Sequence, residues 1–216
     1  MLPFLLRPVG RPVSVVAIGA HCDDIEIGAG GLLMRLVETV PDVKLHCLVL
    51  SSTPRRAAEA RASLAAWVTP VVPEVTIGTL VDSRLPASFD AVKDALAQAA
   101  ARPADLVLCP HAGDAHQDHA LLGRLVPTAF RDHVVLQYEI PKWDGDLGAS
   151  RPQAYVPLDE WHVQRKWALL DEHYPSQRGH DWWTADTFGA LARLRGIESR
   201  TQYAEAFRVD KLTLSF

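Results

Sequence analysis

The chain has 216 residues, of which 48% are hydrophobic and 22% are charged, and its formal net charge is −4 at pH 7. These values are typical of a globular protein, and we expect residues 1–216 to form a single domain. The small negative charge argues against nucleic acid or a membrane surface as the main partner. No stretch reaches the roughly 20 apolar residues that a membrane-spanning helix needs.

Cysteine usage and the N-terminal segment predict a cytoplasmic protein. Cys22, Cys47 and Cys109 are too few and too scattered for a disulfide framework, and no Cys-x-x-Cys spacing occurs. Cys47 and Cys109 lie within apolar runs, which is typical of small buried residues. The N-terminal segment MLPFLLRPVGRPV lacks the charged start and the long apolar centre of a signal peptide.

Apolar runs alternate with helical patterns over the first two thirds of the chain. Strands are expected at Val13–Ala20, Val43–Ser51, Val71–Ile77, Asp105–Cys109 and His133–Ile140. Helices are expected at Ile27–Thr39, Pro54–Val68, Ser88–Ala101 and Asp118–Phe130. Short continuous runs of Val, Ile and Leu between helices indicate strands covered on both faces. The alternation predicts an α/β, Rossmann-like three-layer fold with a mostly parallel central sheet.

The last third of the chain has a different character. Residues 141–158 are rich in Gly, Pro and aromatic residues, and we expect an ordered excursion over the surface or the mouth of the site. A helix is expected at Asp159–Tyr174, with Asp159 as its N-cap, and another at Trp183–Leu194. The segment YAEAFRV, from Tyr203, is expected to close the sheet as a further strand.

Two clusters of polar residues follow predicted strands. The sequence HCDD, from His21 to Asp24, follows the first strand, and HAGDAHQDH, from His111 to His119, follows the fourth. Ligands of open parallel sheets bind outside the carboxyl ends of the strands, and strands one and four are commonly neighbours in such sheets. We therefore expect the two clusters to meet across a crevice.

The pooled side chains of the clusters suit a divalent metal such as zinc, which binds His nitrogen and carboxylate oxygen. They are His21, Asp23, Asp24, His111, Asp114, His116, Asp118 and His119. A dication also offsets the repulsion between Asp23 and Asp24, so that one carboxylate can bind the ion while the other serves as a base. The alternative is that the acids simply cap a helix N-terminus, and either cluster alone is a weak signal.

Two other site types fit the sequence poorly. Gly28, Gly30 and Gly31 lie too far beyond the first strand for a dinucleotide-binding turn, and acids occupy the place where a pyrophosphate would bind. These glycines more naturally let the helix pack closely on the sheet. No G-x-S-x-G motif is present, and Cys22 lies beside two acids that should raise its pKa, so a nucleophile-based hydrolase is disfavoured.

The two clusters together resemble the PIG-L/LmbE-like N-acetylglucosaminyl deacetylase family. Residues 20–24, AHCDD, match the family's A-H-x-D-D sequence, and residues 110–119, PHAGDAHQDH, match its P-H-x-x-D-x-H-x-D-H signature. The segment RAAEA from Arg56 resembles its R-x-x-E-A helix. Lys166 with HYPSQ resembles its K…H-x-S-Q segment with one extra residue, and YAEAF resembles its terminal A-E-x-F. The resemblance spans almost the whole chain.

The resemblance implies roles for the clustered residues. His21, Asp24 and His119 would bind Zn²⁺, with another divalent metal as the alternative, and Asp23 would be the general base. His116 would steady the oxyanion that forms on the attacked carbonyl. These roles agree with the ability of zinc to acidify water and to polarise an amide carbonyl.

Further roles follow from the same resemblance or from spacing. Arg56 and Gln177 would bind the substrate. Asp118, two residues from His116, is expected either to orient the His116 ring or to cap the helix that follows. Glu59 is expected to be a strut rather than a catalyst, and His111 and Asp114 are expected to shape their loop.

The activity implied is zinc-dependent hydrolysis of the N-acetyl group of an amino sugar or sugar conjugate, in polysaccharide, glycoconjugate or natural-product biosynthesis. The alternatives are a non-catalytic, metal-dependent sugar- or nucleotide-binding module on the same scaffold and, less favoured, a nucleotide-cofactor enzyme. The expected partner is a small N-acetylated sugar rather than nucleic acid, and a homo-oligomer is left open. The exact substrate does not follow from the sequence.

Two departures from the family pattern bear on the pocket. Cys22 stands where Pro or Ala is usual, and we expect it to be inert. The loop after the second strand, SSTPRR, is short, which predicts a more open pocket. Four tryptophans are candidates for an apolar platform that contacts a sugar or a larger acceptor. For each of them the alternative is that it is a core or interface residue. They are Trp143, Trp161, Trp182 and Trp183.

Overall fold

The computed structural model describes residues 10–142 and 151–213. Within these residues one sheet of seven strands has the order β3-β2-β1-β4-β5-β7-β6. The strands are β1 (Val13–Gly19), β2 (Val43–Ser51), β3 (Glu74–Leu80), β4 (Leu106–Pro110), β5 (Val134–Tyr138), β6 (Ala154–Leu158) and β7 (Tyr203–Val209). Strands β1 to β5 pair in parallel, whereas β7 runs antiparallel to both β5 and β6. The prediction of a mostly parallel sheet is confirmed.

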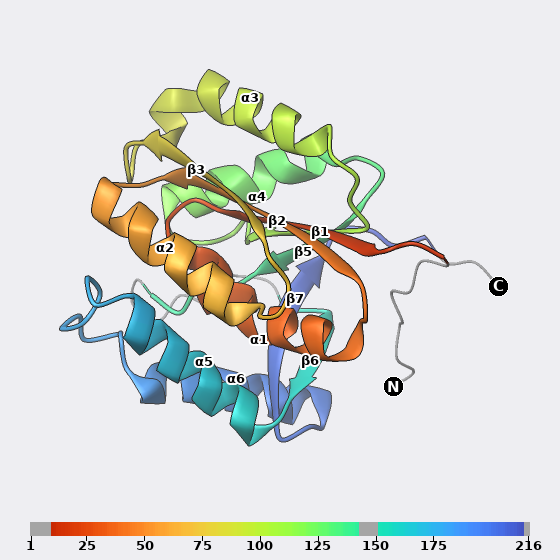
Figure 1. Cartoon of the computed structure of the whole chain (residues 1–216), viewed down its shortest axis with the longest axis vertical. Helices are drawn as coiled ribbons and strands as arrows, with labels where there is room; N and C mark the ends of the chain where they lie inside the picture. The colour runs from red at the N-terminus through yellow and green to blue at the C-terminus, as the bar shows by residue number, and fades with distance from the viewer. Residues whose placement is uncertain (1–9, 143–150, 214–216) are drawn as a thin grey trace.

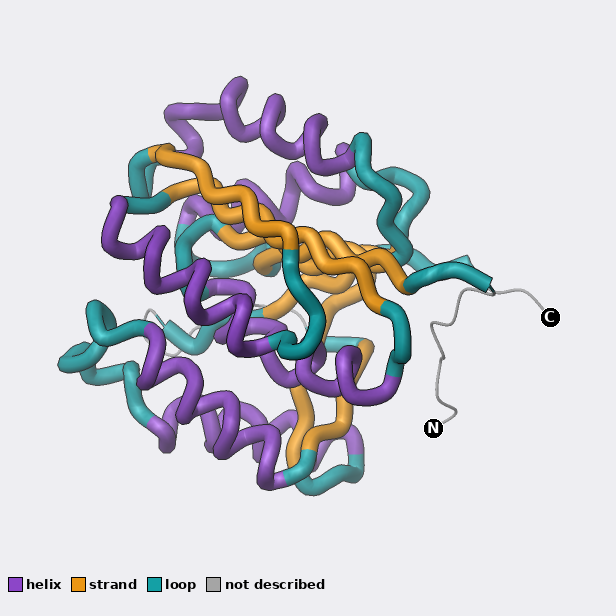
Figure 2. Tube along the Cα trace, viewed as in Figure 1, coloured by secondary structure: helices purple, strands orange, loops and turns teal. Residues whose placement is uncertain are grey.

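Helices cover both faces of this sheet (Figure 1). They are α1 (Asp24–Thr39), α2 (Pro54–Trp67), α3 (Phe89–Ala100), α4 (Gln117–Ala129), α5 (Glu160–His173) and α6 (Ala185–Ser199), with a short 3-10 turn at Leu85–Ser88. Helices α3 and α4 lie on one face, and α1 and α2 lie on the other (Figures 1 and 2). Helix α5 packs against α1 and α2, and α6 packs against α5, β6 and β7. The described part of the chain thus forms the expected layers, with α5 and α6 added beside α1 and α2.

The alternation of side chains along β1 explains why the sheet is covered twice. All seven residues of β1 are buried. Val15 and Ala17 join the core beneath α1 and α2, while Val16 and Ile18 join the core beneath α3 and α4. Because successive strand residues point to opposite faces, an uninterrupted apolar run can only be satisfied by helices on both sides.

Gly28 and Gly30 of α1 let two elements, β5 and α2, approach the helix backbone. A Cβ added at Gly28 would lie 2.0 Å from the Tyr138 ring, and one at Gly30 would lie 2.4 Å from the Trp67 ring. The Trp67 indole also donates a hydrogen bond to the Gly30 carbonyl at 2.8 Å. The expectation that these glycines serve close packing is therefore confirmed.

Several boundaries differ from those expected. Helix α1 begins at Asp24 rather than Ile27, so the second carboxylate of HCDD already belongs to the helix. Within the expected excursion, Ala154–Leu158 forms edge strand β6, while Trp143 lies outside the described residues. Helix α6 begins at Ala185, where the Thr184 hydroxyl accepts a hydrogen bond from the Thr187 amide. In the described residues we find no helix of the length and apolar character needed to cross a membrane.

The pairing of β1 with β4 positions the site. Val15, Val16 and Ala17 pair in register with Leu106, Val107 and Leu108. The segments that follow the two strands therefore leave the same edge of the sheet side by side. This confirms the expectation that the two polar clusters meet.

Candidate metal centre and active-site pocket

Asp24 shapes the turn that leaves β1. Its Oδ2 atom accepts hydrogen bonds from the amides of Ala20 at 2.8 Å and His21 at 2.9 Å, which fixes the turn before α1 begins. Its Oδ1 atom lies 3.2 Å from Nε2 of His119, a residue of the first turn of α4. One carboxylate thus joins the two clusters.

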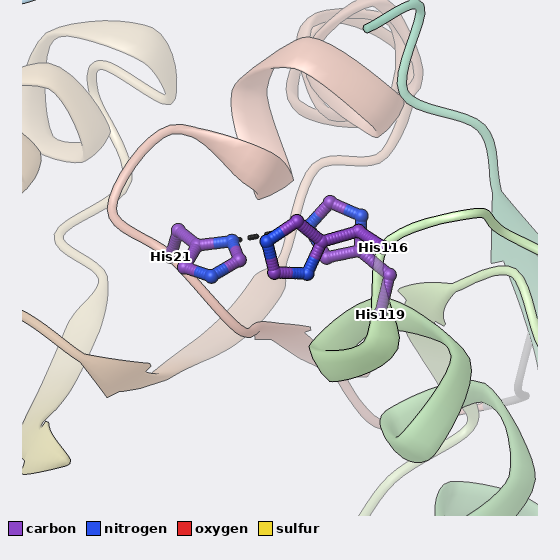
Figure 3. A group of neighbouring side chains, drawn as sticks. All are labelled: His21, His116 and His119. Carbon is purple, nitrogen blue, oxygen red and sulfur yellow. Dashed lines mark hydrogen bonds between the residues drawn. The ribbon is translucent and has the colours of Figure 1, made fainter. Parts of the chain in front are cut away.

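Three donor groups converge at this point. His21 Nδ1 lies 3.0 Å from His119 Nε2 and 3.4 Å from Asp24 Oδ2, and the two imidazole rings face each other across the gap in Figure 3. Ligands of a tetrahedral zinc ion, each about 2.0–2.2 Å from the metal, are about 3.3 Å apart. His21 Nδ1 and His119 Nε2 are separated from each other, and each from its nearer Asp24 oxygen, by distances of this order, so these three groups could hold one ion.

The electrostatics of these groups suit a cation. Burial acts to lower the pKa of both imidazoles, but the neighbouring carboxylates together outweigh it. Asp24 with Asp118 and Asp82 raises the pKa of His21 to about 12, and Asp24 with Asp114 raises that of His119 to about 9. Burial acts to raise the pKa of Asp24, but the two imidazoles hold it well below its usual range. Without a metal, protons supply the positive charge that the carboxylate requires, and a divalent ion would replace them.

A second layer of carboxylates lies behind the imidazoles. His21 Nε2 lies 3.0 Å from Asp82 Oδ1 and 3.3 Å from Asp118 Oδ2. His119 Nδ1 lies 3.1 Å from Asp114 Oδ2. Metal-binding histidines usually present their outer ring nitrogen to such a carboxylate, which fixes the ring and its tautomer. Asp114 therefore does more than shape its loop, whereas His111 accepts a hydrogen bond from the Gly113 amide, as expected of a loop residue.

Asp118 does not cap α4, which was one of its two expected roles. His116, not Asp118, occupies the N-cap position of α4, and its Nδ1 atom accepts a hydrogen bond from the Asp118 amide at 3.2 Å. The fully buried Asp118 carboxylate accepts hydrogen bonds from the amides of Ser83 at 2.8 Å and Leu85 at 3.1 Å, in addition to facing His21. Expecting Asp118 to cap α4 was wrong, because the side chain turns away from its own helix.

His116 packs against both candidate ligands. Its ring centroid lies 4.7 Å from those of His21 and His119, and its side chain is buried (Figure 3). Burial and the neighbouring imidazoles lower its pKa, which favours the neutral ring. Because Nδ1 accepts a hydrogen bond, the neutral ring carries its proton on Nε2, which makes this atom a donor. His116 is not on the pocket wall, and its predicted contact with an oxyanion stays a prediction.

A cavity of about 340 Å³ opens beside the three donor groups. This volume falls in the range of small-molecule sites. Its walls include the candidate ligands His21, Asp24 and His119 and three further predicted site residues, Asp23, Arg56 and Gln177, whereas His116 and Asp118 do not line it. Ser51, Ser52 and Thr53 of the short loop after β2 also line it. The sequence motifs thus meet at one pocket.

The Asp23 side chain lines this pocket and does not cap α1. It occupies the N-cap position of α1, but its side chain makes no capping hydrogen bond. Instead its Oδ2 atom lies 3.0 Å from Nη2 of Arg56. The capping alternative for this carboxylate is therefore not supported, and its position suits a base beside the metal centre.

The structure also places Cys22 and the described tryptophans that the sequence singled out. The Cys22 thiol lies 3.7 Å from the Ser51 carbonyl, and burial raises its pKa to about 12. A thiol in this state is not a nucleophile, which supports the expectation that Cys22 is inert. Trp183 is buried in the core and Trp161 is 56% exposed, whereas Trp182 lines the pocket.

Sequence reasoning missed Asp82 as part of the site. It follows β3, at the same edge of the sheet as the two recognised clusters, and lines the pocket. The signal was a third polar residue at a strand carboxyl end, in the segment VDSRLP. Ser83, which follows it, adopts a positive φ of 63°, so the turn is sharply folded and its amide reaches Asp118.

Comparison with known proteins identifies the family of the chain. The sequence profile of the GlcNAc-PI de-N-acetylase family (PIG-L) matches residues 16–130, which include both His/Asp clusters. The chain therefore belongs to the PIG-L family, as the resemblance implied. Among curated proteins, none matches the chain in sequence.

Solved structures share the fold at low sequence identity. The N,N'-diacetylchitobiose deacetylase from Pyrococcus horikoshii is 18% identical with a TM-score of 0.71, covering 91% of this chain and 83% of that one. The 4-carboxy-2-hydroxymuconate hydratase GalB from Pseudomonas putida is 18% identical with a TM-score of 0.74, covering 94% and 98%. A zinc-inhibited form of teicoplanin deacetylase is 15% identical with a TM-score of 0.68, covering 94% and 100%. These likenesses show the fold alone.

Proposed function

We propose that the protein is a zinc-dependent deacetylase that removes the N-acetyl group from an amino sugar or sugar conjugate. The observation that carries the proposal is the convergence of His21 Nδ1, His119 Nε2 and the Asp24 carboxylate, whose nearest atoms lie 3.0–3.4 Å apart, on the wall of a ligand-sized cavity. Membership of a family described as a de-N-acetylase supplies the reaction class. We assign the activity to the whole chain as one domain.

The proposed reaction divides labour among the residues of the pocket. His21, Asp24 and His119 would hold the ion, which when bound supplies the Lewis acidity that activates water and polarises an amide carbonyl. Asp23 accepts a proton from the attacking water, whose oxygen bonds to the acyl carbon. The Nε2–H of His116 is proposed to donate to the developing oxyanion, a contact often worth a few kcal/mol.

The leaving amine then takes a proton from Asp23 or His116 as the carbon–nitrogen bond breaks. The products are acetate and the free amine, so one water is consumed and no other reactant is needed. Gln177, together with Trp182 and Lys142 on the same wall, is proposed to contact the sugar. The three cysteines are free and buried, which supports our proposal of a reducing compartment, the cytoplasm.

The test is a screen of N-acetylated amino sugars, free, nucleotide-linked and lipid-linked, against zinc-loaded protein with detection of acetate. We expect release from at least one class, loss of release with a chelator, and recovery on adding zinc. Bound zinc with no acetate from any class would contradict the proposal. It would favour the non-catalytic binding module, or the hydration chemistry named for the GalB neighbour, which shares the fold.

A further inference from the structure

The guanidinium of Arg56 is fixed by protein groups on several sides. Its Nη1 atom donates a hydrogen bond to Ser176 Oγ at 2.8 Å and lies 3.3 Å from Glu59 Oε2. Its Cζ atom lies 5.2 Å from the ring centroid of the buried Tyr174. An arginine that binds substrate would be expected to make fewer contacts with protein groups, because some of its guanidinium donors must be free to bind the ligand.

The remaining contact of the guanidinium is with the proposed base. Arg56 Nη2 lies 3.0 Å from Asp23 Oδ2, and the Arg56 and Asp23 side chains are only 18% and 8% exposed. A guanidinium is planar, and its donors diverge at fixed angles, so its placement dictates where a bonded carboxylate can lie. Because both side chains are largely buried, water screens this ion pair less than it screens a pair on the protein surface.

Glu59 and Ser176 contact the guanidinium of Arg56 at Nη1, whereas Asp23 contacts it at Nη2. Glu59 Oε1 accepts a hydrogen bond from the Ser176 amide at 3.2 Å, and Glu59 Oε2 accepts one from the Ser176 hydroxyl at 2.5 Å. With its proton directed to Glu59, the hydroxyl presents its oxygen to Arg56. Helix α2 and the segment after α5 are thus tied together by one carboxylate.

The segment that carries Ser176 is also tied to the turn that carries Asp23. The Tyr174 hydroxyl donates to the Cys22 carbonyl, and it lies 2.6 Å from Glu26 Oε1. The segment after α5 therefore contacts both Arg56 and the backbone next to Asp23, so the positions of the two charged groups are set by the same residues.

We propose that Arg56 is a positioning residue that orients the Asp23 carboxylate, with Glu59 and Ser176 as its brace, rather than a substrate-binding residue. This inference rests on the proposed function, in which Asp23 is the base. It reassigns Arg56 from the role implied by the family resemblance, and it gives Glu59 and Ser176 a place in the same device.

Steady-state kinetics of the zinc-loaded full chain separate the two roles. For Arg56→Ala we expect kcat to fall by about ten- to a hundredfold, with KM changed by less than about twofold. Ser176→Ala and Glu59→Gln should lower kcat in the same direction by a smaller factor. Arg55→Ala is the matched control, because Arg55 is exposed and points its charge at Glu59 from 3.5 Å without touching Asp23. A raised KM with kcat retained in Arg56→Ala would overturn the proposal.

A second measurement needs no substrate. Denaturant unfolding gives the unfolding free energy of Asp23→Ala, Arg56→Ala and the double variant. We expect the sum of the losses in the two single variants to exceed the loss in the double variant. Strictly additive losses would overturn the proposal, whatever the activity. Coupled losses in a protein that releases no acetate would instead overturn the proposed deacetylase function and leave the contact standing, so the two failures are distinguishable.

Discussion

His21 Nε2 lies 3.3 Å from the carboxylate of Asp118. Asp118 is fully buried and belongs to α4, the helix that also carries His119. The ring of one candidate ligand is therefore held by a residue adjacent in sequence to the other. Asp118 also accepts hydrogen bonds from the amides of Ser83 and Leu85, which anchors the turn after β3. Through this one carboxylate, three strand ends are fixed relative to one another.

Asp118 should consequently tune metal affinity. We expect Asp118→Asn to weaken zinc binding by about ten- to a hundredfold, because the amide loses the charge facing His21 and keeps only one of the two oxygens that accept backbone hydrogen bonds. Competition with a fluorescent zinc chelator measures the affinity. Asp90→Asn, an exposed residue of the first turn of α3, serves as the control and should bind zinc as the wild type does. Equal affinities in all three proteins would refute this role.

Metal removal should lower thermal stability as well as activity. Zinc at a hundred times its dissociation constant stabilises the folded state by about 2.7 kcal/mol, which corresponds to roughly 5–10 °C in a chain of this size. Chelator-treated protein should melt at a lower temperature by about this amount and recover when zinc is added. In His119→Ala the zinc-dependent shift should disappear. A melting temperature indifferent to both chelator and zinc would argue against a metal site.

The buried carboxyl of Glu26 should give the protein a pH-dependent stability. Burial raises its pKa from 4.5 to about 7, so the folded state keeps a proton that the unfolded state releases above pH 4.5. The stabilisation is complete below pH 4.5 and is lost as the pH rises through 7, by an amount on the order of 3 kcal/mol.

Glu26→Gln removes this titration, and its side-chain amide can donate a hydrogen bond to the Tyr174 hydroxyl oxygen in place of the protonated carboxyl. Denaturant unfolding of both proteins at several values between pH 4.5 and 8 should show a difference in unfolding free energy that changes across this window in favour of the variant. Curves that stay parallel over the whole range would mean that Glu26 keeps an ordinary pKa.

The space around two helical glycines predicts opposite effects of substitution on stability, a loss at Gly28 of α1 and a gain at Gly189 of α6. Gly28→Ala places a Cβ 2.0 Å from the Tyr138 ring, and we expect a loss of about 1–3 kcal/mol despite the better helix propensity of alanine. Gly189→Ala in α6 meets nothing within 4 Å, so it should gain about 0.5–1 kcal/mol. Thermal melts of the two variants provide the comparison, and a stabilised Gly28→Ala would show that the core accommodates the methyl group.

Much of the fold was predictable because its signals are local. The buried runs at Val13–Gly19 and Val43–Ser51 are continuous and apolar, which identifies central parallel strands without reference to their neighbours. Strand β6 escaped prediction because Ala154–Leu158 contains a proline and lies on the edge of the sheet. Its pairing with β7 is a tertiary contact between segments about fifty residues apart, which local pattern cannot reveal.

The site divides in the same way. The meeting of the two clusters that carry His21, Asp24 and His119 was predictable, because ligand-binding residues concentrate at strand ends and two polar clusters occur there. The direction of a side chain was not predictable, and Asp118 turns toward His21 rather than capping its own helix. Asp82 was missed because a single acid in a loop has no motif of its own, and its contact with His21 depends on the turn at Ser83.

The central proposal is that Asp23 is the base of a metal-dependent deacetylation, and one measurement tests it most directly. Acetate release and bound zinc are measured on the same samples of the wild type and Asp23→Asn, with the best substrate from the screen. We expect the variant to keep its zinc and to lose activity by about a hundredfold or more. A variant that retains full zinc and full acetate release would contradict the proposed mechanism.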